Sequence, residues 1–414
     1  MSSGGYGKTE IDPFDRAFWD SGRVFSRIGE GALGGKANGL VFTQEALETQ
    51  VLPTRSPNLE TSIPRSTVLT TEIFDLFMDK NGLRQAVDSG LPDDRIAHEF
   101  QKAEMPVEVV GDLRALIEKV HTPLAVRSSS LLEDALFRPF AGVYATKMTP
   151  NNQPDATTRF RKLIEAIKFV WASTFFSAAR DYMRVIERGF DDEKMAVIIQ
   201  EVVGNRRGGL FYPEVSGVAR SYNFYTQGDV APDEGVVSLA LGLGKTIVDG
   251  EVCWTYVPTR PGAPPPFASV RDMLQRTQLQ YWAVNMGPPP EFDPTKETEY
   301  LGRYDLATAD YDGSLDRIVS TYEPKSDRLY PGTGRRGPRV LTFAPLLEDE
   351  PSFNETLKKL LWSCMSAMGA AVEIEFALRL PCPGGPRVPG FCVLQVRPMV
   401  VSKQPVTIEA SEFS

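Results

Sequence analysis

The chain has 414 residues, of which 42% are hydrophobic and 24% are charged, and its formal net charge is −9. This is the composition of a globular protein of about two or three structural units, and it excludes a disordered or fibrous chain. The acidic balance and the lack of basic runs argue against a nucleic-acid partner, and no apolar stretch reaches the roughly 18 residues that a membrane span needs.

The start of the chain and its cysteines bear on where the protein works. The polar segment MSSGGYGKTE is unlike a signal peptide, so we expect a cytoplasmic protein. None of the four cysteines stands in a C-x-x-C pair, and we expect reduced thiols. A disulfide between Cys382 and Cys392, which flank a Pro/Gly turn, is the less favoured alternative.

Helices dominate the elements expected in the first half. Residues 1–26 form a polar, irregular segment, and a glycine run at 34–35 then precedes helical spacing of apolar residues over 41–49. This pattern indicates a glycine loop that opens a helix. Arg127 ends a strand, and the three serines that follow it are expected to cap a helix beginning near Leu131. Further helices are expected at residues 72–80, 96–102, 107–120 and 156–188, and short strands at 63–69 and 123–126.

Strands dominate the second half. The Pro-, Gly- and charge-rich segments 258–300 and 323–338 are expected to be long surface loops. Strands are expected at residues 195–203, 217–225, 235–241, 371–378 and 390–397, and a helix at 354–369. We therefore divide the chain into an N-terminal segment, two lobes and a tail, with bounds 1–26, 27–193, 194–400 and 401–414.

The last two strands allow a geometric prediction. Glu373 and Glu375 share one face of their strand because side chains alternate, while the apolar residues around them face the other side. Gln395 and Arg397 likewise share a face, so tight antiparallel pairing brings all four together. Carboxylate and amide oxygens suit Mg²⁺ bound with nucleotide phosphates, and a guanidinium suits phosphate oxygens. A solvated sheet face of mixed charge is the alternative.

Two other segments carry groups that suit phosphate. Gly34 and Gly35 let backbone amides approach an anion, and Lys36 adds a positive charge at a helix N-terminus. Arg127 and the serines after it offer a guanidinium and several hydrogen-bond donors. A plain helix-capping loop and a serine cap beside a surface arginine are the respective alternatives.

Two more segments are ambiguous on their own. The segment 241–246 ends in Gly-Lys-Thr, but Leu239 stands where the pattern G-x-x-x-x-G-K-[ST] requires glycine, so it is not a P-loop. The strand at 198–203 runs into a polar pair and offers backbone donors and acceptors to an adenine edge. Taken alone, it is simply a strand.

Six segments in this order resemble the nucleotide-binding domain of the phosphoenolpyruvate synthase and pyruvate phosphate dikinase family, over roughly residues 27–400. They are GGKANGL, LAVRSSSLLEDALFRPFAGVYATKM, VIIQEVVG, SGVARSYN, VSLALGLGKTIVDGE and the pair VEIEFAL with VLQVRPM. The second segment includes the acidic pair Glu133-Asp134 and the stretch Phe140-Ala141-Gly142.

The resemblance implies an α+β, ATP-grasp-like fold with ATP held between two lobes. It implies phosphate-binding and catalytic roles for Lys36, Arg127 and Arg397. It implies Mg²⁺ binding by Glu373, Glu375 and Gln395, and nucleotide contacts from Gly34, Gly35, Lys36, Arg127, Gln200, Glu201, Val203, Gly242, Gly244 and Lys245. Catalysis of this kind is mainly positioning and charge neutralisation, for which these residue types suffice.

The chain departs from the family pattern at two places. Lys245 stands where relatives often have glutamate, and Arg220 with Ser221 stand where many have Phe-Thr. The dikinases also use a histidine on a separate domain, which neither His98 nor His121 resembles.

These departures shape the expected function. We expect an ATP- and Mg²⁺-dependent phosphotransferase domain whose acceptor lies on a phosphohistidine-domain protein or on missing domains of a longer chain. The chain alone should not convert pyruvate to phosphoenolpyruvate. A non-catalytic ATP-binding regulatory module and a self-contained small-molecule kinase are the alternatives.

Overall fold

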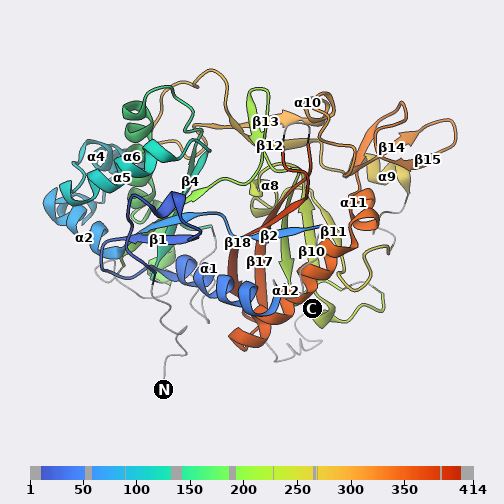
Figure 1. The fold of residues 1–414 in the computed structure, drawn as a ribbon, viewed down its shortest axis with the longest axis horizontal. Helices are drawn as coiled ribbons and strands as arrows, with labels where there is room; N and C mark the ends of the chain where they lie inside the picture. The colour runs from blue at the N-terminus through green and yellow to red at the C-terminus, as the bar shows by residue number, and fades with distance from the viewer. Residues whose placement is uncertain are drawn as a thin grey trace, which may run out of the picture.

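The computed structural model describes residues 11–51, 58–88, 90–131, 142–185, 193–226, 228–263, 267, 269–382 and 385–401. Within these residues, helices and strands mix in an α+β arrangement built on two larger sheets and two smaller ones (Figure 1). The expected helix beyond Leu131, with Glu133, Asp134, Phe140 and Ala141, lies outside the described residues.

A five-stranded sheet forms the first body. Its strand order is β1-β3-β6-β4-β5, and only the β1–β3 pair is parallel. The strands are β1 (Phe25–Ile28), β3 (Ser66–Leu69), β6 (Met195–Glu201), β4 (Leu124–Ser130) and β5 (Thr146–Thr149).

The helices from the same part of the chain lie over this sheet and over one another: α2 and α6 contact its strands, α4 and α5 pack against α6, and α3 packs against α2 and α4. The helices of this part are α2 (Thr71–Lys80), α3 (Leu83–Asp88), α4 (Asp93–Lys102), α5 (Val107–Lys119), α6 (Ala156–Ser173) and α7 (Ser177–Val185). The rings of Phe74, Phe77 and Trp171 lie fully buried between them. Short helical elements in the described residues include η1 (Phe18–Asp20), the π-helical η2 (Leu47–Val51) and η4 (Pro232–Glu234).

The three serines after Arg127 belong to a strand, and the helix that they were expected to cap lies outside the described residues. Ser128, Ser129 and Ser130 continue β4, are fully buried, and pair with residues 195–197 of β6. The ladder with β6 satisfies their backbone groups, so the strand extends through residues that favour caps when they stand alone.

A six-stranded sheet forms the second body, in the order β11-β10-β9-β17-β18-β2. The strands are β11 (Trp254–Tyr256), β10 (Val236–Ala240), β9 (Val215–Arg220), β17 (Val372–Arg379), β18 (Gly390–Pro398) and β2 (Glu60–Ser62). The helices α1 (Gly35–Ala46) and α12 (Pro351–Met368) pack side by side against it (Figure 1). The hydrophobic face of β17, formed by Val372, Ile374 and Phe376, is buried as predicted.

Two small sheets contain strands from segments that were expected to be long surface loops. One is β13-β12-β8-β7 and the other β15-β14-β16, so the segments 258–300 and 323–338 are not wholly irregular. β12 carries buried Tyr281, Ala283 and Val284, an apolar pattern masked by its proline-rich flanks. The elements are β7 (Asn205–Arg207), β8 (Leu210–Tyr212), β12 (Gln280–Asn285), β13 (Leu301–Asp305), β14 (Val319–Glu323), β15 (Arg328–Pro331), β16 (Arg339–Leu341), α8 (Lys245–Val248), α9 (Val270–Gln275), α10 (Leu306–Tyr311) and α11 (Ala344–Asp349).

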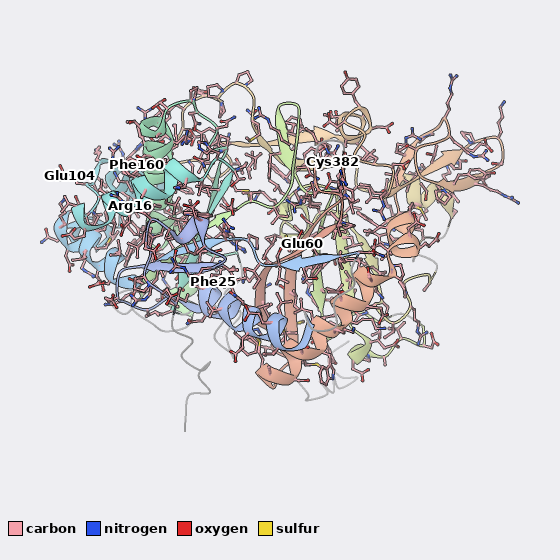
Figure 2. The ribbon with its side chains drawn as sticks, viewed as in Figure 1. Arg16, Phe25, Glu60, Glu104, Phe160 and Cys382 are labelled. Atoms are coloured by element: carbon pink, nitrogen blue, oxygen red, sulfur yellow. The ribbon has the colours of Figure 1, made fainter. Side chains whose placement is uncertain are left out.

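The chain crosses between the two larger sheets more than once. β6 follows residue 193 yet lies at the centre of the five-stranded sheet, whereas β2 precedes it and pairs in parallel with β18. Figure 2 shows Glu60 on β2, away from Phe25 and Phe160 on the first body. A division at residue 193 therefore does not separate the two sheets.

A buried ion pair joins the five-stranded sheet to the segment before β13. Lys147 of β5 and Glu299 are each 1% exposed in their side chains, and Lys147 Nζ lies 2.8 Å from Glu299 Oε2. Lys147 also donates to the carbonyl oxygens of Pro294 and Lys296, at 2.9 and 2.8 Å. Burial lowers the pKa of Lys147, an effect that the Glu299 carboxylate opposes.

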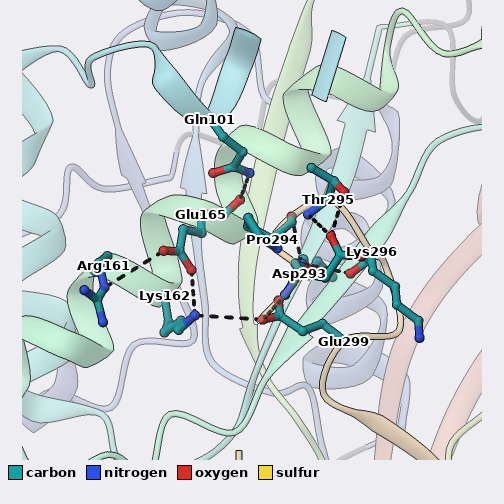
Figure 3. A network of polar contacts seen from close by, with 10 residues as sticks. Gln101, Arg161, Lys162, Glu165, Asp293, Pro294, Thr295, Lys296 and Glu299 are labelled. Carbon is teal, nitrogen blue, oxygen red and sulfur yellow. Dashed lines mark hydrogen bonds and ion pairs between the residues drawn. The ribbon is translucent and has the colours of Figure 1, made fainter. Parts of the chain in front are cut away.

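Neighbouring charges extend this pair. Figure 3 shows Lys162 of α6 between Glu165 and Glu299, with its Nζ 2.9 Å from Glu165 Oε2 and 3.8 Å from Glu299 Oε1. The result is a network that fixes the 293–299 segment on the edge of the first body.

The remaining features of the fold are the state of its cysteines and the apolar character of its helices. All four cysteines are free thiols, and burial raises the pKa of Cys364 to about 12. No helix in the described part of the chain combines the length and apolar character that crossing a bilayer requires.

Candidate functional site

The β17–β18 hairpin has the register that the alternation of its side chains predicted. Glu373 lies opposite Arg397 and Glu375 opposite Gln395, and an irregularity in pairing follows between Glu375 and Phe376. Glu373 and Gln395 are 5% and 3% exposed, so the polar face of the hairpin is largely covered.

Arg127 reaches this hairpin from the five-stranded sheet. Its Nη2 donates to Glu375 Oε2 at 3.1 Å and to Gln395 Oε1 at 2.8 Å. Its Nη1 donates to the carbonyl oxygen of Leu394 at 2.8 Å and to Gln200 Oε1 at 3.3 Å. The two sheets therefore meet at one guanidinium, which bonds to two of the three predicted metal ligands.

Two more arginines hold the third predicted metal ligand, Glu373. Arg397 Nε donates to Glu373 Oε1 at 2.7 Å, and its Nη2 contacts the same oxygen. Arg220 Nε donates to Glu373 Oε2 at 2.6 Å. We call the group Arg127, Arg220, Glu373, Glu375, Gln395 and Arg397 the hairpin cluster.

Arg220 was noted from the sequence as a departure and was not predicted to belong to the site. The signal that could have placed it is its position at the end of β9. Pairing of β9 with β17 sets Arg220 directly opposite Glu373. A register between two strands far apart in sequence is hard to infer from one chain, because each strand offers several alternatives.

The first glycine loop docks onto β4 next to Arg127. Gly34 precedes α1 with φ 77°, and a Cβ there would lie 1.8 Å from the carbonyl oxygen of Ser129, so only glycine fits. Ser129 Oγ accepts from the amide of Ala37 at 3.0 Å. Gly35 is the first residue of α1, and Lys36 Nζ donates to Ser128 Oγ at 2.9 Å. The loop thus places Lys36 beside the strand that carries Arg127.

The predicted adenine segment is largely engaged with the protein itself. Gln200 is 2% exposed, and its side chain accepts from Arg127 and donates to Ser66 Oγ at 3.3 Å. The amide of Glu201 donates to the carbonyl oxygen of Arg65 at 3.1 Å. Val203 follows the end of β6. Gln200 therefore orients Arg127 in this structure.

The second glycine loop has other partners. Gly242 has φ 83°, and its carbonyl oxygen accepts from Ser216 Oγ at 2.5 Å, while Gly244 precedes α8. Lys245 Nζ lies 3.2 Å from Asp249 Oδ1 and 5.7 Å from the ring centre of Trp282. Among the described contacts, none joins Lys245 to the hairpin cluster.

The hairpin cluster is chemically suited to bind phosphates. Three guanidinium groups surround two carboxylates, which leaves an excess of positive charge, and Lys36 stands on the next segment. Guanidinium groups bind phosphate oxygens through charge-assisted hydrogen bonds. No group of three or more His, Cys, Asp or Glu side chains in the described residues is arranged to hold a metal ion.

Comparison with known proteins shows the family to which the chain belongs. The profile of the family described as "Pyruvate phosphate dikinase, AMP/ATP-binding domain" matches residues 30–413, so the chain belongs to that family. The resemblance drawn from the six segments is confirmed.

Two curated relatives agree with this family. An uncharacterized phosphotransferase, YvkC, of Bacillus subtilis is 28% identical over 46% of this chain and 20% of its own length. A phosphoenolpyruvate synthase of Aeropyrum pernix is 25% identical over 46% of this chain and 24% of its own length. The matched part thus spans about a quarter or less of these relatives.

Replacing Glu375 with glutamine should weaken Mg²⁺-dependent ATP binding by about tenfold or more, because a carboxylate is a far better ligand for Mg²⁺ than an amide. Titration of ATP at a series of Mg²⁺ concentrations measures the effect. Glu355→Gln, on the exposed face of α12 beside Lys358, is the matched control. Unchanged Mg²⁺ dependence in both Glu375→Gln and Glu373→Gln would contradict the metal assignment of the hairpin.

Proposed function

We propose that this chain is an ATP- and Mg²⁺-dependent phosphotransferase domain of the phosphoenolpyruvate synthase and pyruvate phosphate dikinase type. In this proposal its fold is ATP-grasp-like, and ATP binds between two lobes. The observation that carries the proposal is Arg127, which extends from the five-stranded sheet to Glu375 and Gln395 on the six-stranded sheet. A ligand at this point touches both bodies. Family membership supports the nucleotide, and the cationic excess supports its phosphates.

The residues of the hairpin fit Mg²⁺ by the chemistry of their donors. Glu375 and Gln395 offer carboxylate and amide oxygens, the hard ligands that Mg²⁺ prefers with nucleotide phosphates. When bound, the ion would neutralise phosphate charge. Because Arg127 donates to both oxygens, ATP phosphates must draw the guanidinium toward themselves to free these donors.

The chain's own residues then act by positioning and charge. Arg127 of β4 and Lys36 of α1, which donates to the neighbouring Ser128, would hold the transferring phosphates from one side, and Arg397 would hold them from the hairpin. Gln200 keeps the guanidinium of Arg127 oriented. Phosphoryl transfer needs little covalent chemistry from the protein, so this set of residues is sufficient.

The acceptor is proposed to be a histidine on another protein or on another part of a longer chain. The test is incubation with ATP labelled at the β or the γ phosphate, with and without candidate histidine-domain proteins, followed by analysis of AMP, ADP and phosphate. Transfer of the β label to the histidine domain with release of AMP supports the proposal. Tight ATP binding without any turnover in every mixture would instead favour a regulatory module, and transfer to a small molecule would favour a self-contained kinase.

A further inference from the structure

Arg220 is an arginine in the site that the proposed function does not yet use. It ends β9, directly opposite Glu373 of β17, and its side chain is 33% exposed. Ser221 fixes this position, because its amide donates to the carbonyl oxygen of Val372 and its Oγ accepts from the amide of Val372 at 2.8 Å. The sheet ladder is thereby extended by one residue, and Arg220 cannot swing away with a fraying strand end.

The contacts of Glu373 differ from those of Glu375. Both oxygens of Glu373 accept from guanidinium groups, Oε1 from Arg397 and Oε2 from Arg220, and the side chain is only 6% exposed. Two positive charges thus face one negative charge. A divalent cation approaching Glu373 meets like charge and finds both carboxylate oxygens occupied, whereas an anion is attracted.

Arg220 meets Glu373 through Nε alone. A guanidinium has five N–H donors in a fixed plane; of the four on its two terminal nitrogens, one lies parallel to Nε–H and the other three point away from a carboxylate bound at Nε. Among the described residues, the hydrogen bond and ion pair of the Arg220 guanidinium go to Glu373, and a third of the side chain is open to solvent. These donors are arranged to bind a second anion while Glu373 holds the first nitrogen.

We propose that Arg220 is a further phosphate-binding residue of this site, and that it replaces a divalent cation at Glu373 so that one metal ion, at Glu375 and Gln395, accompanies the nucleotide. The proposal rests on the proposed function. It explains two unusual residues together, since Arg220 supplies the charge and Ser221 anchors the backbone that presents it.

Metal-free tripolyphosphate is the probe that separates phosphate contact from catalysis. The Arg220→Leu variant should bind it about ten- to a hundredfold more weakly than the wild-type chain in the presence of a chelator, because a charge-assisted hydrogen bond is lost. Arg220→Lys keeps the positive charge but loses the planar set of guanidinium donors. Its affinity for tripolyphosphate should therefore lie between those of the wild-type chain and Arg220→Leu. Arg84→Leu is the matched control, since Arg84 also pairs with carboxylates, those of Asp75 and Asp79, outside the site.

The count of bound Mn²⁺, measured by electron paramagnetic resonance with a non-hydrolysable ATP analogue, is the second readout. We expect one ion in the wild-type chain and two in Arg220→Leu, where Glu373 has lost one of its two arginine partners. Wild-type tripolyphosphate affinity and an unchanged ion count in Arg220→Leu would overturn the inference while leaving the proposed function standing. Failure of the wild-type chain to bind either ATP or tripolyphosphate would overturn both.

Discussion

Replacing Arg127 with alanine should lower turnover of ATP by about a thousandfold or more while leaving adenosine affinity unchanged. A guanidinium that stabilises a transferring phosphoryl group contributes on the order of 10³ to 10⁵ in rate. Arg127 contacts Gln200, Glu375 and Gln395 at once, so its loss also removes the hydrogen bonds that it makes between the two sheets at the site. The labelled-ATP assay measures turnover, and calorimetric titration measures ATP and adenosine affinity.

Arg84→Ala serves as the control, because Arg84 pairs with Asp75 and Asp79 far from the hairpin cluster. This variant should keep the wild-type turnover of ATP and the wild-type affinities for ATP and adenosine. An equal loss of ATP and adenosine affinity in Arg127→Ala would contradict a phosphate role for Arg127. Thermal unfolding of the variant then shows whether its fold is intact.

Replacing Lys147 with methionine should reduce the free energy of unfolding by about 3–5 kcal/mol. Breaking a buried ion pair leaves the remaining charge unpaired, and Glu299 has a side chain only 1% exposed. The carbonyl oxygens of Pro294 and Lys296 lose their donor as well. Urea unfolding of the purified chain measures the change.

Lys358→Met removes an exposed ion pair with Glu355 and should cost less than about 1 kcal/mol. The double variant Lys147→Met/Glu299→Leu should regain part of the loss, because it removes both charges. A loss below about 1 kcal/mol in Lys147→Met would show that solvent or nearby Lys162 compensates Glu299 and that the pair is not a structural anchor.

The parts of the site predicted from sequence are those governed by local periodicity. Alternation in β17 and β18 fixed which side chains share a face, and the short connection between the strands made their antiparallel pairing the natural choice. The glycine loop before α1 was predictable for a similar reason, since a backbone with positive φ leading into a helix needs glycine at Gly34.

The parts that were missed depend on partners distant in sequence. Ser128 to Ser130 have the chemistry of a helix cap, but pairing with β6 makes them a strand. Arg220 joins the site through β17, about 150 residues later, and the structure adds Gln200 as a partner of Arg127 rather than an open adenine contact. Local preference cannot report such pairings, because they are decided by tertiary structure.

The pairing of β2 with β18, which is made much later in synthesis, has a consequence for folding during biosynthesis. Ser62 on β2 contacts Cys392 on β18, 330 residues later. At roughly 5–20 residues per second, a ribosome needs on the order of 15 to 65 seconds to make that length. During this interval β18, the strand of the six-stranded sheet that α1 contacts, has not yet been made, so apolar residues of α1 such as Leu40 lack part of their cover. The nascent chain therefore depends on transient shielding, by a chaperone or by the first body, until β18 emerges.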